Sequence, residues 1–235
     1  MNVFAIADLH LSSSGEKPMD IFGPAWVGHY QQIEDNWRRL ISEGDLVLLP
    51  GDLSWALRLD DAMADLRLIE SLPGEKVFIQ GNHDYWFSSP AKVRGVLGPH
   101  THLVRFDAGV FGRVAVCGTR GWLWPGHPEY KPDEDAKYWN RELKRLELSL
   151  RPLARLQWDV AVAMLHFPPL DANGASEMCE MIRAAGVRFA VYGHLHGEAT
   201  RDAFEGERDG VLYKCVSADK LNFSPVLLFQ HPPAP

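Results

Sequence analysis

The fold is decided by the stretch Leu46-Val47-Leu48-Leu49-Pro50-Gly51-Asp52. In it, an apolar run leads directly into a glycine and an acidic residue. A short continuous apolar run of this kind predicts a strand that is buried on both faces. Helical periodicity precedes it at Gln31–Ser42 and follows it at Asp60–Ser71. Buried strands that alternate with helices predict a parallel or mixed sheet covered by helices.

The same alternation extends in both directions along the chain. Val3–Ala7 and Val77–Ile79 are predicted as further buried strands. Asp133–Leu150 is predicted as a long helix with Asp133 as its N-cap, and Gly174–Ala185 as a shorter helix. The remaining predicted strands are Thr101–Phe106, Arg113–Cys117, Val160–Leu165, Phe189–Tyr192, Ala199–Phe204, Val211–Val216 and Pro225–Phe229. Since no repeat or linker interrupts the pattern, we expect residues 1–235 to form a single domain.

The composition is ordinary for a globular protein, with 46% hydrophobic and 23% charged residues. A net charge of −7 argues against a broad basic surface, so binding of long nucleic acids is not expected. The three cysteines show no Cys-x-x-Cys spacing and predict neither a disulfide framework nor a zinc ribbon. The N-terminal run has no basic region, and no apolar run reaches the ~18–20 residues that a bilayer span needs. We therefore expect a cytoplasmic protein without a membrane span, whose oligomeric state stays open.

Five short segments carry most of the polar residues that could perform chemistry, and each follows a predicted buried strand. These segments are Asp8-Leu9-His10, Gly51-Asp52, Gly81-Asn82-His83-Asp84, His166 and Gly193-His194-Leu195-His196. Ligands in open α/β sheets bind outside the carboxyl ends of the strands, so five strands would deliver these side chains to one edge. Any one of them alone is explained as a turn, cap or loop residue, but the five together are not.

These side chains predict a metal centre. In Asp8-x-His10 and His194-x-His196, the intervening residue lets both flanking side chains point to one side of an extended backbone. Carboxylate, imidazole and amide ligands suit Mn²⁺, Fe²⁺ or Fe³⁺, Zn²⁺ or Co²⁺, and argue against Cu⁺ or an iron–sulfur cluster. The candidate ligands are Asp8, His10, Asp52, Asn82, His166, His194 and His196. They are too many for one tetrahedral ion, so we expect two divalent ions that share a bridging carboxylate.

The ordered set Asp-x-His, Gly-Asp, Gly-Asn-His-Asp, His and Gly-His-x-His resembles the calcineurin-like metallophosphoesterases over residues 8–196. The resemblance implies an α/β fold, a four-layer α/β/β/α sandwich with two mixed β-sheets flanked by helices. It implies that Asp8, His10 and His196 bind the first ion. It also implies that Asn82, His166 and His194 bind the second ion and that Asp52 bridges the two.

The second motif departs from the pattern of many family members. They continue it as Gly-Asp-x-x-Asp or with a following arginine, whereas this chain reads Gly51-Asp52-Leu53-Ser54-Trp55. The missing charge removes the basis for transferring the phosphate contact of the protein phosphatases. We therefore do not expect a protein serine/threonine phosphatase.

The resemblance implies a hydrolase, a phosphatase or phosphodiesterase that acts on a small phosphorylated substrate. Two metal ions would neutralise the phosphoryl oxygens and lower the pKa of a bridging water toward ~7, so that a bridging hydroxide attacks without a covalent phosphoenzyme. His83 is expected near the leaving oxygen as a general acid or electrostatic support. Asp84 is expected to orient His83 or to stabilise its charge.

The Thr119–Tyr138 segment is rich in aromatic residues and long for a connection, which predicts a lid, a substrate-binding loop or a hydrophobic plug. Arg120 is the candidate for a phosphate contact, although a surface salt bridge explains it equally well. Trp122 is the candidate for stacking on a base or sugar. Trp26 and Trp55 are expected to serve as packing residues.

Two other functions remain open. A nuclease of the same superfamily is expected to show a basic stripe or an added nucleic-acid domain, and the sequence shows neither. A protein-interaction scaffold with this fold, such as a retromer subunit, has lost metal-site residues. All seven ligand positions and His83 are filled here, so the scaffold that stays open is a metal-bound one with little activity.

Overall fold

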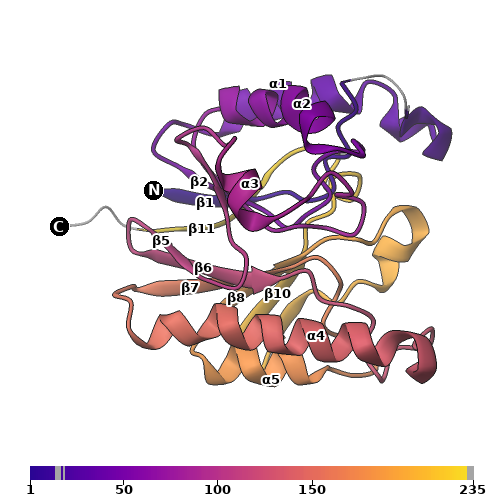
Figure 1. Cartoon of the computed structure of the whole chain (residues 1–235), viewed down its shortest axis with the longest axis vertical. Coiled ribbons are helices and arrows are strands. Elements are labelled where there is room, and N and C mark those ends of the chain that lie inside the picture. The colour runs from indigo at the N-terminus through magenta and orange to yellow at the C-terminus, as the bar shows by residue number, and fades with distance from the viewer. Residues whose placement is uncertain (14–16, 18, 232–235) are drawn as a thin grey trace.

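The computed structural model of the chain describes residues 1–13, 17 and 19–231. Two β-sheets lie face to face between two layers of helices, as Figure 1 shows. The sheets have five and six strands and each contains both parallel and antiparallel pairs. The predicted α/β/β/α sandwich with two mixed sheets is confirmed.

The first sheet has the strand order β11-β1-β2-β3-β4. The bounds are Asn2–Ala5 for β1, Leu46–Leu49 for β2, Glu75–Phe78 for β3, Thr101–Leu103 for β4 and Val226–Gln230 for β11. Strands β1 to β4 run parallel, and β11 pairs antiparallel with β1. Helices α1 (His29–Leu40) and α2 (Leu59–Ser71) cover its outer face, and the short α3 (Pro90–Arg94) lies near β4.

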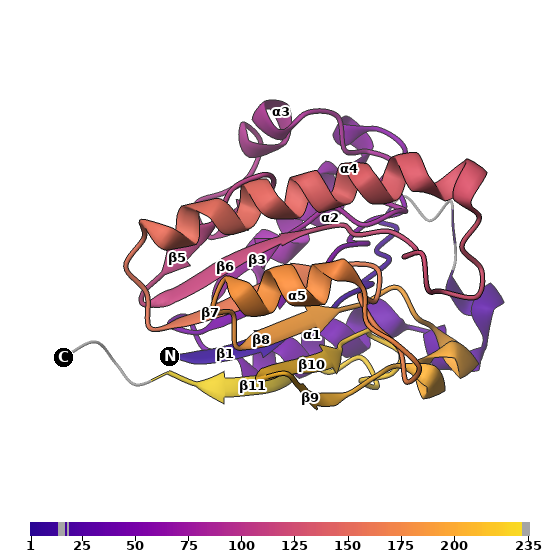
Figure 2. The same cartoon turned by 90° about the horizontal axis from the view of Figure 1, so that it is seen from below.

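The second sheet has the order β5-β6-β7-β8-β10-β9. The bounds are Gly109–Phe111 for β5, Val114–Thr119 for β6, Val160–Leu165 for β7, Phe189–Tyr192 for β8, Gly206–Arg208 for β9 and Val211–Cys215 for β10. The four central strands run parallel, and β5 and β9 are antiparallel edges. Helices α4 (Pro132–Leu150) and α5 (Glu177–Ala184) cover this sheet, as Figure 2 shows from below.

The position of β2 between the second sheet and the helices explains why its apolar residues do not alternate with polar ones. Leu46 and Leu48 face the second sheet, where they belong to a core with Val116 and Val162. Val47 and Leu49 face the helices α1 and α2 instead. Because both faces of β2 are buried, every position of the strand is apolar.

Several predicted elements differ from the structure. The predicted strand Ala199–Phe204 is wrong, because the chain forms a 3-10 helix over Gly197–Asp202. A local hydrogen bond stabilises this helix: the hydroxyl group of Thr200 donates to the carbonyl oxygen of Gly197. Asp133 is not the N-cap of α4. Pro132 begins that helix, and the carboxylate of Asp135 accepts the N–H group of Lys131 at 2.8 Å.

Within the described residues, none of the helices combines the length and the apolar character that crossing a membrane requires.

Candidate metal centre

The predicted segments converge at one end of the sandwich, because the parallel strands of both sheets end there. The first sheet supplies the segments after β1, β2 and β3, and the second sheet supplies those after β7 and β8. A backbone bridge between Ala7 and Ser217 joins the two sheets beside these segments. The candidate ligands therefore come from both sheets.

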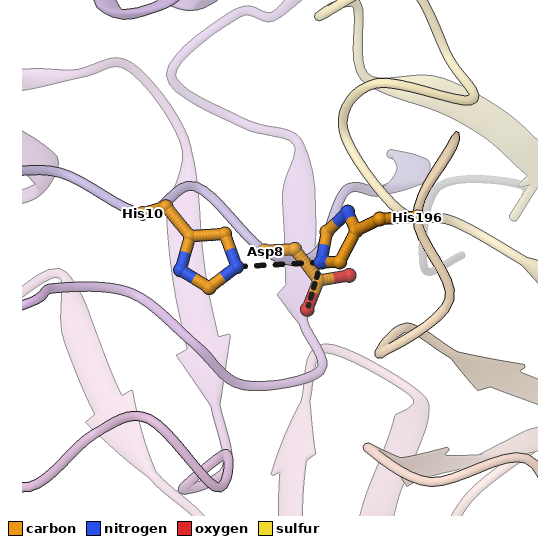
Figure 3. A group of neighbouring side chains, drawn as sticks. All are labelled: Asp8, His10 and His196. Atoms are coloured by element: carbon orange, nitrogen blue, oxygen red, sulfur yellow. Dashed lines mark hydrogen bonds and ion pairs between the residues drawn. The ribbon is translucent and has the colours of Figure 1, made fainter. Parts of the chain in front are cut away.

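The first group of candidate ligands is Asp8, His10 and His196, whose ligand atoms lie within 4.8 Å of one another (Figure 3). The Nε2 atoms of His10 and His196 face each other at 3.3 Å. The Nε2 atom of His196 lies 3.9 Å from Oδ1 of Asp8. Asp8 and His10 are buried, and His196 is partly exposed. The structure thus brings together the three residues that were expected at the first ion.

The second group is Asp8, Asp52 and His166, which meet the same distance criterion. The Nε2 atom of His166 lies 3.4 Å from Oδ2 of Asp52 and 2.6 Å from Oδ1 of Asn82. That amide oxygen also lies 3.0 Å from Nδ1 of His194. The four residues expected at the second ion are therefore neighbours. Asp8 belongs to both groups, which the sequence did not indicate.

Hydrogen bonds on the outer nitrogen atoms of two imidazoles fix which ring nitrogen faces the cluster. The Nδ1–H group of His166 donates to the carbonyl oxygen of Pro50 at 2.9 Å. The Nδ1–H group of His196 donates to Oδ1 of Asp219 at 3.1 Å. A proton fixed on Nδ1 directs the lone pair of Nε2 into the cluster.

The donor set and its burial fit divalent cations. Asp8 and Asp52 are fully buried carboxylates that lie beside the same imidazole, and buried carboxylates need compensating positive charge. Among the described atoms, Nδ1 of His10 is buried without a hydrogen-bond partner, whereas Nε2 of the same ring faces His196 and Asp52. Imidazole, carboxylate and amide donors suit divalent ions such as Mn²⁺, Fe²⁺, Zn²⁺ and Co²⁺.

Burial and charge shift the pKa values within the cluster. Burial lowers the pKa of His10 and of His194 to about 3, so both rings are neutral at pH 7. Burial raises the pKa of Asp8 to about 6. Burial alone would lower the pKa of His166, but the charge of Asp52 outweighs it and raises the value to about 9. Metal ions bind the neutral form of imidazole, so an ion would have to displace the second proton that Asp52 keeps on His166.

The backbone of the centre is held in unusual conformations. Asp8, His10, Asp52 and His194 have φ values of 60°, 45°, 54° and 73°, in the left-handed region that side chains other than glycine rarely adopt. Each such residue costs on the order of 1–3 kcal/mol, and the surrounding structure must supply that energy. Gly193 is required beside them, because a Cβ atom there would lie 2.5 Å from Oδ2 of Asp8.

His83 lies beside the centre with a half-buried ring. Its backbone N–H group donates to Oδ1 of Asp52 at 2.8 Å, and its ring centroid lies 5.8 Å from that of His10. Among the described residues, the Nδ1 atom of this ring has no hydrogen-bond partner. We expected Asp84 to orient the ring of His83 or to stabilise its charge, and the structure places Asp84 in a different role. The carboxylate of Asp84 bonds instead to backbone N–H groups of the second and third motifs and to the indole of Trp86.

Arg120 contacts the centre through its backbone. Its carbonyl oxygen accepts the N–H group of His166 at 3.0 Å. Its side chain points to the buried Glu142 at 3.7 Å, and its guanidinium lies 4.9 Å from the ring centroid of Trp122. The expected alternative of a salt bridge matches this geometry, although the pair is buried and not at the surface.

Trp122 is held beside the centre by its neighbours. Its indole N–H group donates to Oδ1 of Asp135 at 2.9 Å. Its ring lies 5.1 Å from that of Phe167, which in turn lies 4.0 Å from the ring of His194. The indole thus packs against Phe167. Of the roles expected for the Thr119–Tyr138 segment, this packing matches the hydrophobic plug.

Asp219 is a residue of this site that the sequence interpretation missed. Its carboxylate accepts the Nδ1–H group of His196 at 3.1 Å and the backbone N–H group of Gly197 at 2.8 Å. Asp219 follows β10 by a few residues, as the recognised acids follow their strands. This position after a strand could have marked Asp219 as a site residue. Unlike Asp8 or His194, however, it has no second candidate ligand two residues away in the sequence.

Known proteins resemble this chain in sequence or in fold. The family model for the calcineurin-like phosphoesterases matches residues 1–198. A solved structure of a protein of unknown function from Aquifex aeolicus, AQ665, has 13% sequence identity and a TM-score of 0.51, and the match covers 96% of this chain and 95% of that one. The structure of TT1561 from Thermus thermophilus has 13% identity and a TM-score of 0.49, with 83% and 81% covered. No curated protein matches the chain. The family match over most of the chain shows that this protein, with its buried aspartate and histidine cluster, belongs to the calcineurin-like phosphoesterase family.

Proposed function

We propose that the protein hydrolyses phosphomonoesters or phosphodiesters with two divalent metal ions. The observation that carries this proposal is the position of Asp52. Its Oδ2 atom lies 3.9 Å from Nε2 of His10 and 3.4 Å from Nε2 of His166, so one carboxylate oxygen faces both groups of ligands. A shared carboxylate between two ligand groups is the arrangement that two-metal sites use.

The ions would be held by the residues of the two groups, with Mn²⁺, Fe²⁺ or Fe³⁺, Zn²⁺ and Co²⁺ as the candidates. Asp8, His10 and His196 would hold the first ion, and Asn82, His166 and His194, which are neighbours, would hold the second. Asp52, whose Oδ2 atom faces His10 and His166, would serve both ions. When bound, the ions supply positive charge for the phosphoryl oxygens and a water molecule of lowered pKa.

The other residues position these ligands and move a proton. Pro50 and Asp219 fix the proton of His166 and of His196 on Nδ1, which keeps both Nε2 atoms available. The imidazole of His83 lies next to the cluster, where it donates a proton to the leaving oxygen of the ester. Asp84 acts as a positioning residue, because it binds the backbone that carries Asp52.

The test is metal analysis combined with turnover. Protein is reconstituted separately with Mn²⁺, Fe²⁺, Zn²⁺ and Co²⁺, and hydrolysis of p-nitrophenyl phosphate and of its bis ester is measured. We expect two equivalents of metal and turnover of at least one ester. In His83→Asn we expect turnover to fall by about 10²–10⁴ while the metal content stays unchanged. Two equivalents of metal without hydrolysis of any phosphoester would instead support the metal-bound scaffold.

A further inference from the structure

A cavity of about 440 Å³ opens beside the candidate metal centre. Its outer walls are apolar and consist of Met19, Phe22, Trp26 and Trp55. The wall toward the centre is formed by the rings of His10, His83 and His196. The cavity therefore adjoins both the first group of ligands and the proposed proton donor.

Trp55 provides one aromatic wall at the position where many family members carry a charge. Its ring is stacked on that of His10, with centroids 4.8 Å apart and an angle of 19° between the planes. It also lies 4.5 Å from the ring of His83. The indole N–H group donates to Sδ of Met19 at 2.9 Å. Because this polar atom is bonded within the wall, Trp55 offers the cavity an apolar surface.

Trp26 and Phe22 provide the other aromatic surfaces. The ring of Trp26 is 5% exposed and packs edge-on against His196 at 5.6 Å and Phe223 at 5.1 Å, so it is rigidly held. Phe22 is 61% exposed and lies at the end of the 3-10 helix Met19–Phe22, whose Met19 is buried. An exposed aromatic ring next to rigid aromatic walls is a typical feature of a binding site.

The chemistry of the lining defines what the cavity accepts. Of the described residues that line it, none carries a carboxylate, ammonium or guanidinium group, and the ammonium group of Lys17 lies outside this lining, 4.8 Å from the ring centroid of Trp55. Two indoles and a phenyl ring favour stacking with a flat ring over contact with a flexible chain. The volume lies within the range of pockets that hold small organic ligands, ~300–1,000 Å³.

We infer that this cavity binds a planar aromatic ring carried on the alcohol side of the phosphoester, as in a nucleoside. The inference rests on the proposed function, because the phosphoryl group must lie at the metal centre for the alcohol to reach the cavity. His83 lines the same cavity. A proton donor at this position faces the oxygen that leaves with the aromatic alcohol.

Binding of a neutral nucleoside tests the cavity without any hydrolysis. Adenosine and ribose are titrated calorimetrically into the full-length, Mn²⁺-loaded protein. We expect adenosine to bind at least about tenfold more tightly than ribose, since ribose has the same sugar hydroxyls without the base. Phe22→Ala should weaken adenosine binding about tenfold. The matched control is Ile21→Ala, because Ile21 lies on the same 3-10 helix, is 73% exposed and does not line the cavity.

Turnover gives the second measurement. AMP and ribose 5-phosphate contain the same ester oxygen, so a difference in kcat/KM reports the base and not the leaving group. We expect wild type and Ile21→Ala to prefer AMP, and Phe22→Ala to lose most of that preference through a lower kcat/KM for AMP. Equal binding of adenosine and ribose, or a preference for octyl phosphate over AMP, would overturn the inference. Absence of all phosphoester hydrolysis would overturn the proposed function instead, and the adenosine titration would still decide the role of the cavity.

Discussion

The carboxylate of Asp84 accepts the backbone N–H group of Asp52 at 2.9 Å, across 32 residues of sequence. It also accepts the N–H groups of Leu53 at 2.9 Å and Gly81 at 2.8 Å. One buried carboxylate thus ties the loop after β2 to the loop after β3. The acid of the third motif determines where the acid of the second motif lies.

Asp84→Asn is expected to disturb both loops, because an amide cannot accept hydrogen bonds with both of its terminal atoms. Backbone N–H groups left without an acceptor should cost about 2–3 kcal/mol of unfolding free energy. Metal content should fall as well, since Asp52 loses its anchor. Urea unfolding and metal analysis measure the two effects. The exposed Asp133→Asn is the control, with an expected change within about 0.5 kcal/mol. An Asp84→Asn protein with unchanged stability would contradict this role.

Gly81→Ala is expected to disrupt the centre by steric conflict. A Cβ atom on Gly81 would overlap Oδ1 and the backbone nitrogen of Asp52, so the carboxylate of Asp52 would have to move. We expect a loss of about 1–3 kcal/mol in stability together with reduced metal content. Gly44→Ala is the matched control, because a Cβ atom there meets nothing within 4 Å. Thermal unfolding of both variants, with metal analysis, distinguishes the two sites, and equal behaviour would refute the steric argument.

Asp219→Ala is expected to weaken metal binding without removing a ligand. Loss of the carboxylate frees the ring of His196 to rotate, and changes of this kind typically cost about 10–100-fold in metal affinity. Calorimetric titration with Mn²⁺ or Zn²⁺ measures the change. Asp202→Ala, an exposed acid at the end of the 3-10 helix Gly197–Asp202, should leave the affinity unchanged. If both variants bind metal as wild type does, the orienting role of Asp219 is wrong.

Glu142→Gln is expected to destabilise the second sheet and α4. Glu142 is fully buried, pairs with Arg145 at 2.6 Å and Arg120 at 3.7 Å, and accepts the hydroxyl of Thr119 at 2.6 Å. Removing one partner of a buried ion pair typically costs about 3–5 kcal/mol. Chemical denaturation measures this loss. Glu147→Gln, an exposed change on the same helix, should stay within about 0.5 kcal/mol, and a similar value for Glu142→Gln would show that the buried charges contribute little.

The sequence was most informative where a strand buried on both faces ended in a polar residue. Asp8, Asp52 and His166 could be placed together because parallel strands bring their carboxyl ends to one edge. The partners of Asp84 in the loop after β2 could not be predicted, since they lie 30 to 32 residues away and only the packed loops bring them close. The aromatic cavity was missed for a related reason. Met19 and Trp26 come from a segment without periodicity, where the direction of their side chains only becomes visible in the fold.

The division of the ligands between the two sheets has a thermodynamic consequence. Asp52 and Asn82 come from the first sheet, whereas His166 and His194 come from the second, so neither sheet alone holds a complete coordination sphere. An ion bound at this seam would cross-link the halves of the molecule non-covalently and would resist their separation. At a free ion concentration 100 times the dissociation constant, such linkage adds ~2.7 kcal/mol to the unfolding free energy. Bound ions would thus link the docking of the two sheets to the assembly of the centre.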